Sequence, residues 1–140
     1  YEMAPESPHV VALHSQALAY AGQVVAQTES EIPADSAIGR LALMFGESSR
    51  GDAAGVLEQI NDDLKQTARR DCQFSWFVAG ILARVGETDA ALEWMDNALE
   101  KGFINYQAMA VDPFLATLRG EPRFEEFMAR VKQAWEAFEV

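Results

Sequence analysis

The sequence predicts an all-α fold, a short array of helical hairpins (an α-α superhelix) closed by a C-terminal capping helix. Two observations predict this fold. Apolar residues recur at three- and four-residue steps along the 140-residue chain, which is typical of amphipathic helices. Two segments also repeat each other at a spacing of 35 residues: Gly51, Leu57, Glu58 and Leu64 recur as Gly86, Leu92, Glu93 and Leu99. A period in the mid-thirties on helical patterns indicates stacked helix-turn-helix units, which build binding surfaces.

The composition fits a folded, strongly acidic domain. Hydrophobic residues make up 49% of the chain and charged residues 24%, and 22 acidic side chains against 11 basic ones give a formal net charge of −11. Because this charge repels phosphate backbones, we expect no direct nucleic-acid binding. The surplus of carboxylates fits either a basic partner or simply a soluble surface.

Residues 1–35 are predicted to hold a lead-in over residues 1–8 and one helix from Val10 to Gln27, a partial or degenerate repeat. No Asp, Glu, Lys or Arg lies between Ser7 and Thr28, but polar residues interrupt this stretch and make it too polar for membrane insertion. A helix that is uncharged all round has neighbours on more than one face. The neighbour is either a preceding repeat or a second copy of the chain, so a homodimer through this helix is one alternative.

Residues 36–70 are predicted to form a degenerate hairpin. After a turn around Pro33, Asp35 or Ser36 caps the first helix. Gly51 marks the turn to a single partner helix, and the polar run from Lys65 to Asp71 leads to the next hairpin. The apolar stripe of the partner helix consists of Val56, Leu57, Ile60 and Leu64.

Residues 71–104 give the clearest hairpin. The first helix has a broad apolar face made of Phe74, Phe77, Val78, Ile81, Leu82 and Val85. Gly86 ends this helix, Thr88 caps its partner, and Gly102 closes the partner where a left-handed residue is needed. Because the connecting turn is short, the two helices must pack on each other.

Residues 105–140 are predicted to be capping helices. Asp112 followed by Pro113 is a cap with a first-turn proline and starts a short helix, and Pro122 starts a longer one. Glu126 and Arg130 are expected to pair across one turn on its outer side. The apolar face of the longer helix carries Phe124, Phe127, Met128, Val131, Trp135 and Phe138, so we expect it to lie as a lid over the last repeat.

At these residues the chain resembles the tetratricopeptide repeat family. That family places a glycine at the turn, small residues on either side and an Ala-Leu pair late in the second helix, and these correspond here to Ala79, Gly86, Ala91, Ala98 and Leu99. Small residues let two helices approach closely. The run from Gly102 to Phe124 looks like an ending of repeat regions in bacterial multidomain signalling proteins. The resemblance therefore implies the C-terminal interaction module of a larger bacterial protein.

The resemblance implies that the first helix of each repeat lines a groove for a protein or peptide partner. The implied groove residues are Gln73, Trp76, Gly80, Ala83 and Arg84, with Ile38, Leu41 and Phe45 at the equivalent place in the first hairpin. Arg84 is suited to clamp a carboxylate. The alternatives are contacts of these residues with the lid alone, a regulatory domain that senses a small ligand, and a homodimerisation scaffold.

We expect that the chain is not an enzyme and that it has no cofactor and no metal site. The segment from Gly46 to Gly51 has the glycine spacing of a phosphate loop but lacks the Lys and Ser or Thr that must follow. His9 and His14 are five residues apart, which points them to different sides of a helix, whereas ligands on one face need three or four. Cys72 cannot form an internal disulfide because it is the only cysteine. We expect a cytoplasmic protein, with the periplasm as the alternative.

Overall fold

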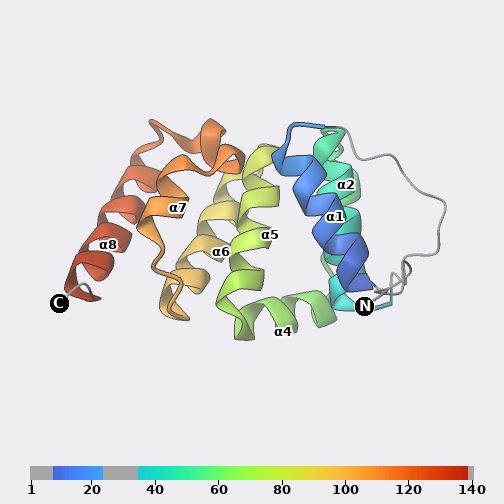
Figure 1. Ribbon diagram of the computed structural model, residues 1–140, viewed down its shortest axis with the longest axis horizontal. Helices are drawn as coiled ribbons and strands as arrows, with labels where there is room; N and C mark the ends of the chain where they lie inside the picture. The colour runs from blue at the N-terminus through green and yellow to red at the C-terminus, as the bar shows by residue number, and fades with distance from the viewer. Residues whose placement is uncertain (1–7, 24–34, 139–140) are drawn as a thin grey trace. The chain divides into compact units, whose positions relative to one another are not determined.

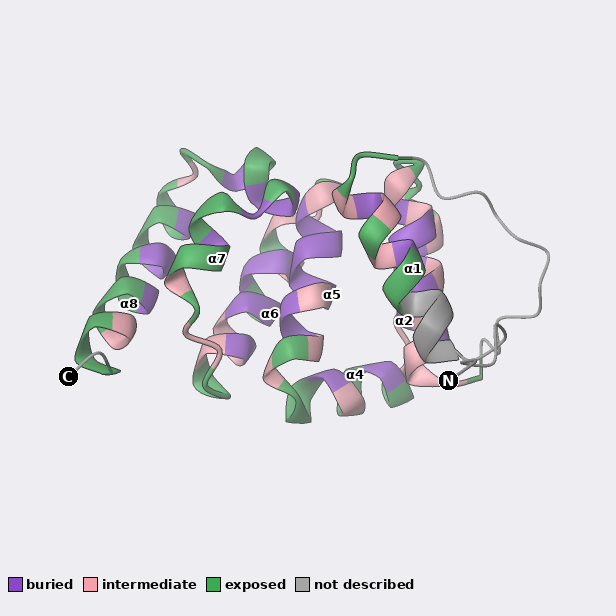
Figure 2. Ribbon diagram, viewed as in Figure 1, coloured by how far each residue is buried: buried purple, intermediate pink, exposed green. Residues whose placement is uncertain are grey.

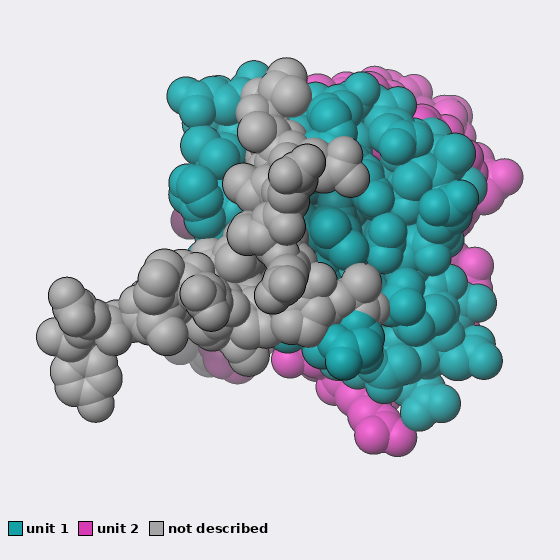
Figure 3. Space-filling view, turned by 90° about the vertical axis from the view of Figure 1, so that its right-hand side faces the viewer, with its two compact units in different colours: residues 1–67 teal, residues 68–140 magenta. Residues whose placement is uncertain are grey.

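The described part of the computed structural model, residues 8–23 and 35–138, is helical and contains no strand (Figure 1). The all-α prediction is confirmed. Residues 1–7 of the predicted lead-in and the turn around Pro33 lie outside the described residues, while Pro8, also predicted to be lead-in, begins a helix. The elements are α1 (Pro8–Tyr20), α2 (Ala37–Ser49), α3 (Ala53–Gln59), α4 (Asp62–Arg70), α5 (Cys72–Arg84), α6 (Thr88–Glu100), α7 (Tyr106–Val111), the 3-10 helix η1 (Pro113–Leu118) and α8 (Pro122–Phe138). The chain forms two compact units, residues 1–67 and 68–140, which Figure 3 colours separately.

In the first unit, α1 packs against α2, and α2 packs against α3. Helix α1 ends at Tyr20, earlier than predicted, because Gly22 adopts φ +71° and closes it. The Gly22 N–H donates to the Ala19 carbonyl (3.1 Å) and the Gln23 N–H to the Leu18 carbonyl (3.0 Å), which is the Schellman pattern of a helix end. Gly22 therefore marks the C-terminal end of α1, which the hydrophobic pattern alone does not indicate.

The predicted single partner helix of the first hairpin is wrong, because the chain breaks it into α3 and α4. Ile60 ends α3, and Asn61 Oδ1 then accepts a hydrogen bond from the Leu64 N–H (2.9 Å), which starts α4. The run from Lys65 onward, predicted to be a connector, is helical as far as Arg70. Leu57, which was placed on the apolar stripe, is 44% exposed.

In the second unit, α5 and α6 form the predicted antiparallel hairpin (Figure 1). Asp71 Oδ1 caps α5 by accepting from the Phe74 N–H (2.9 Å). Most of α5 is buried, as Figure 2 shows. Helix α6 begins at Thr88, but Glu87 occupies the cap position and makes no side-chain cap, so the predicted Thr88 cap is wrong.

The C-terminal segment packs on this hairpin, with η1 against α5 and α8 against α6 and α7. Asp112 Oδ1 accepts from the Phe114 N–H (2.9 Å), so the predicted cap and proline start is confirmed for η1. Pro122 starts α8, also as predicted, and α7 is an additional helix. The buried face of α8, visible in Figure 2, consists of Phe124, Phe127, Met128 and Val131.

A helix cap and a turn glycine occur three times along the chain, at spacings of 35 and then 34 residues. The caps Ser36, Asp71 and Asn105 each accept a hydrogen bond from the backbone N–H three residues on. The turn glycines Gly51, Gly86 and Gly120 follow at the same spacings, each with positive φ (72°, 87° and 92°). The C-terminal segment thus has its first cap and its turn glycine at the same relative positions as the hairpin before it. The pattern of its apolar residues did not indicate this similarity.

Candidate functional site

All the predicted groove residues on α5 except Gln73 lie against the C-terminal segment of their own chain. The Trp76 indole Nε1 donates to Asp112 Oδ2 (3.2 Å), and the Trp76 ring stacks on Phe103 with centroids 5.3 Å apart. The Ala83 carbonyl accepts from Thr117 Oγ1 (3.0 Å). The structure thus places Trp76 and Ala83 in contact with the segment that starts and forms η1.

Gly80 and Arg84 meet the same part of η1. A Cβ at Gly80 would lie 3.4 Å from Phe114 Cβ, and the Arg84 guanidinium lies over the Phe114 ring at 4.7 Å from its centroid. Burial lowers the pKa of Arg84 from its usual value. A Cβ at Gly80 would therefore be in ordinary van der Waals contact with the Phe114 side chain.

The remaining predicted residues are dispersed. Gln73 is exposed near the start of α5. In the first unit, Leu41 and Phe45 are buried and Ile38 is half-buried. Partner binding by this whole set stays a prediction, but with Trp76, Leu41 and Phe45 at 5% exposure or less, the set offers little surface to a partner.

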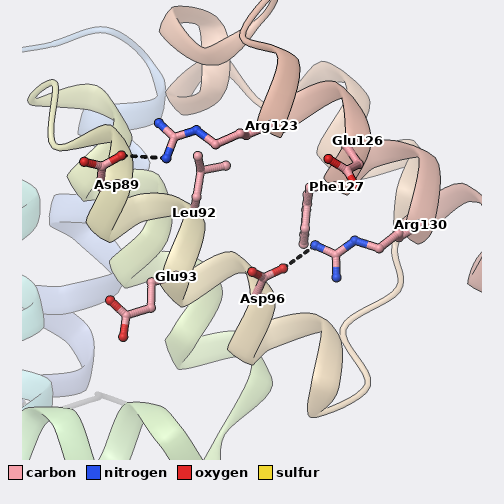
Figure 4. A pocket seen from close by; sticks show the side chains of 8 residues that line it. All are labelled: Asp89, Leu92, Glu93, Asp96, Arg123, Glu126, Phe127 and Arg130. Carbon is pink, nitrogen blue, oxygen red and sulfur yellow. Dashed lines mark hydrogen bonds and ion pairs between the residues drawn. The ribbon is translucent and has the colours of Figure 1, made fainter.

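A groove that the sequence did not indicate lies between α6 and α8 in the second unit (Figure 4). Its volume is about 370 Å³, at the small end of the range for ligand pockets, and it is open to solvent. Its lining is Asp89, Leu92, Glu93 and Asp96 from α6, and Arg123, Glu126, Phe127 and Arg130 from α8. The groove is thus bounded by two helices and is rich in charge.

Two ion pairs join α6 to α8 across this groove, as the dashed lines of Figure 4 show. Arg123 Nη1 contacts Asp89 Oδ1 at 2.7 Å, and Arg130 Nη2 contacts Asp96 Oδ1. On each helix the two partners are seven residues apart, or about 10 Å along the axis. All four side chains are about half exposed or more, and exposed pairs of this kind contribute only about 0–1 kcal/mol each.

Both arginines of the groove are engaged in these ion pairs. Asp89 and Glu121 hold the pKa of Arg123 above its usual value through hydrogen bonds, so its guanidinium is charged and engaged. Arg130 also lies over the Phe127 ring, at 5.5 Å from its centroid. Neither guanidinium is therefore left without a negative partner.

Two glutamates and two apolar side chains complete the lining of the groove. Glu93 and Glu126 are exposed, and within the described residues neither makes an ion pair or a side-chain hydrogen bond. Leu92 and Phe127 are buried, at 8% and 1% exposure. Four carboxylates against two guanidiniums give the groove a net charge of −2.

The predicted pair of Glu126 with Arg130 is wrong, because Arg130 reaches Asp96 on α6. A sequence signal for the true pairing exists. Asp89 and Asp96 are seven residues apart, and so are Arg123 and Arg130, so two helices lying side by side can match both pairs at once.

A second polar cluster lies in the first unit, between α2 and α3. Gln59 Nε2 donates to Glu47 Oε1 (3.1 Å), and Gln59 Oε1 accepts from Arg40 Nη1 (3.4 Å). Glu47 Oε2 and Arg40 Nε are buried and make no hydrogen bond to any described residue. Burial, opposed in part by the Gln59 hydrogen bond, raises the pKa of Glu47 above its ordinary value of 4.5.

Replacing Glu47 with glutamine is expected to stabilise the protein at neutral pH. Because the folded-state pKa is raised, the folded chain binds this proton more tightly than the unfolded chain. The contribution of Glu47 to stability is therefore lost as pH rises from about 4.5 through the folded-state pKa. Melting temperatures across pH 4 to 8 should show Glu47→Gln above the parent chain at pH 7 and level with it near pH 4. Glu100→Gln, at an exposed position on α6, is the control, and an equal gain there would contradict the assignment.

The described residues show neither of two other kinds of site. They contain no group of three or more His, Cys, Asp or Glu side chains arranged to hold a metal ion. No helix among them combines the length and the apolar character needed to cross a membrane. In comparisons with protein-family models, curated proteins and solved structures, nothing matches this chain significantly.

Proposed function

We propose that this chain is a short tetratricopeptide-like interaction module that binds a protein or peptide partner in the groove between α6 and α8. The repeat assignment is supported by the caps and turn glycines that recur at 35 and 34 residues. The binding role is supported by a single observation, the groove of about 370 Å³ with its charged walls. Helical arrays of this kind serve as binding surfaces, and the groove holds no nucleophile-and-base pair that suggests catalysis.

The character of the groove predicts a modest, reversible interaction. Its lining is dominated by charged side chains, while its apolar floor is almost fully buried by the chain itself. Little apolar area is left to drive tight association, and charges govern mainly the rate and specificity of encounter. We therefore expect micromolar rather than nanomolar affinity.

Blocking the groove should abolish peptide binding. Short peptides would be selected from a phage-displayed random library on the intact chain, and their affinities measured for the parent and for Glu126→Trp. The indole would fill the space above Leu92 and Phe127, so we expect affinity to fall about tenfold or more.

The matched control is Gln133→Trp, an exposed position on α8 outside the groove. It should retain the affinity of the parent. Selected peptides that bind both variants as well as the parent, or a selection that yields no binding peptide, would refute the proposed docking site.

A further inference from the structure

We propose that the groove between α6 and α8 selects lysine or arginine side chains of the partner polypeptide, attracted by the carboxylates of Glu93 on its α6 wall and Glu126 on its α8 wall. This inference rests on the proposed function and adds the chemistry of the partner. It follows from how the charges of the groove are already paired.

The two arginines of the groove are committed to their own aspartates. Arg123 is held by Asp89 and Arg130 by Asp96, so the chain itself neutralises both positive charges and both aspartates. The charge left over is that of Glu93 on α6 and Glu126 on α8, which make no ion pair within the described residues. A partner that brings positive charge to the groove would neutralise the two glutamate charges that the chain leaves unpaired.

The floor of the groove suits the stem of such a side chain. Lysine and arginine lay their methylene groups along apolar surface and keep the charged group in water or against carboxylates. Leu92 and Phe127 are the apolar residues of the lining, and Glu93 and Glu126 are its two exposed carboxylates without an ion pair. Figure 4 shows Glu126 beside Phe127 on α8 and Glu93 on the α6 side.

An acidic partner is disfavoured at two levels. It would have to displace Asp89 or Asp96 from an arginine that is already paired, and it would approach a groove of net charge −2. The whole chain carries −11, which repels anions at low salt before any contact forms. A basic segment is instead attracted from a distance, and its association should weaken as salt screens the field.

The test uses two fluorescently labelled helical peptides. One carries two lysines a turn apart beside leucines, and the other carries glutamates in their place. Anisotropy titrations on the intact chain should show binding of the lysine peptide alone. Raising salt from about 0.05 to about 0.5 M should weaken that binding. The isosteric double variant Glu93→Gln/Glu126→Gln should weaken it about tenfold, because the two carboxylates of the groove that have no ion pair of their own are lost while the groove keeps its shape.

A variant with the same change in net charge separates the groove from the general field of the chain. Glu58→Gln/Glu100→Gln also removes two negative charges, at exposed positions outside the groove. It should bind the lysine peptide within about twofold of the parent, since only long-range attraction is reduced. An equal loss in both double variants, preferred binding of the glutamate peptide, or no binding of the lysine peptide would each overturn the inference.

The outcomes also separate this inference from the proposed docking site. If library peptides lose affinity with Glu126→Trp but are not enriched in lysine and arginine, the groove is a docking site with a different selectivity. If Glu126→Trp has no effect on them, both proposals fail together.

Discussion

Replacing Trp76 with alanine is expected to destabilise the second unit by about 3–5 kcal/mol, among the largest effects of any single substitution in this chain. The Trp76 side chain is only 5% exposed, so its truncation leaves a large cavity beside α5. The change also removes the stack on Phe103 and leaves the Asp112 carboxylate without its indole donor. Since small domains are stable by about 5–15 kcal/mol, much of the unfolding free energy is lost.

Urea denaturation followed by circular dichroism measures this loss. Trp76→Phe keeps most of the buried ring but loses the hydrogen bond, so it should cost about 1–3 kcal/mol. A double-mutant cycle of Trp76→Phe with Asp112→Ala should show coupling on the order of 1 kcal/mol, because the two side chains share one contact. Trp135→Ala, a half-buried ring on α8, is the matched control and should cost clearly less.

The same variant distinguishes a core residue from a binding anchor. The family resemblance implied that Trp76 lines a groove, in which case its removal would reduce partner binding and leave the fold intact. The contact with Asp112 instead predicts that stability falls first. A Trp76→Ala chain that unfolds at the parent midpoint while losing peptide binding would contradict the structural role argued above.

The helices were predictable because their signals are local. Four of these signals depend on neighbouring residues alone: the apolar periodicity of α5, the glycine that ends α5, the Asp112–Pro113 start of η1 and the Pro122 start of α8. Asn61 is a local signal of the same kind, an Asx cap, but it lies within a run that otherwise continues the apolar pattern of one helix. The break between α3 and α4 was therefore hidden by periodicity.

The candidate site was not predictable, because it depends on which helices lie side by side. Within α8, a pair of Glu126 with Arg130 is worth only about 0.2–0.5 kcal/mol, and the packing of α8 on α6 offers Arg130 the Asp96 carboxylate instead. For the face of α5, the resemblance implied a groove, with contact to the lid as the alternative, and the apolar pattern could not decide between them. The shared spacing of Asp71 with Asn105 and of Gly86 with Gly120 carries the missing information.

Replacing Phe127 with alanine is the second change expected to have a large effect, a loss of about 3–5 kcal/mol in the free energy of unfolding. Phe127 is 1% exposed on the face of α8 that is buried in the second unit, and its ring lies under the Arg130 guanidinium. Truncation leaves a cavity beneath the groove and removes the surface on which Arg130 rests. The measurement is again the urea midpoint of the intact chain.

Phe127→Leu serves as the matched control, because it nearly conserves the apolar volume and should cost less than about 1.5 kcal/mol. It should also keep peptide binding, since the floor stays apolar and Glu93 and Glu126 are untouched. This residue belongs at once to the core and to the floor of the groove, so its truncation cannot report on binding separately from folding. For that reason the charge of the groove is tested with isosteric glutamines at its rim. If Phe127→Ala leaves the midpoint unchanged, α8 is not packed as described, the groove does not form, and both proposals fall with it.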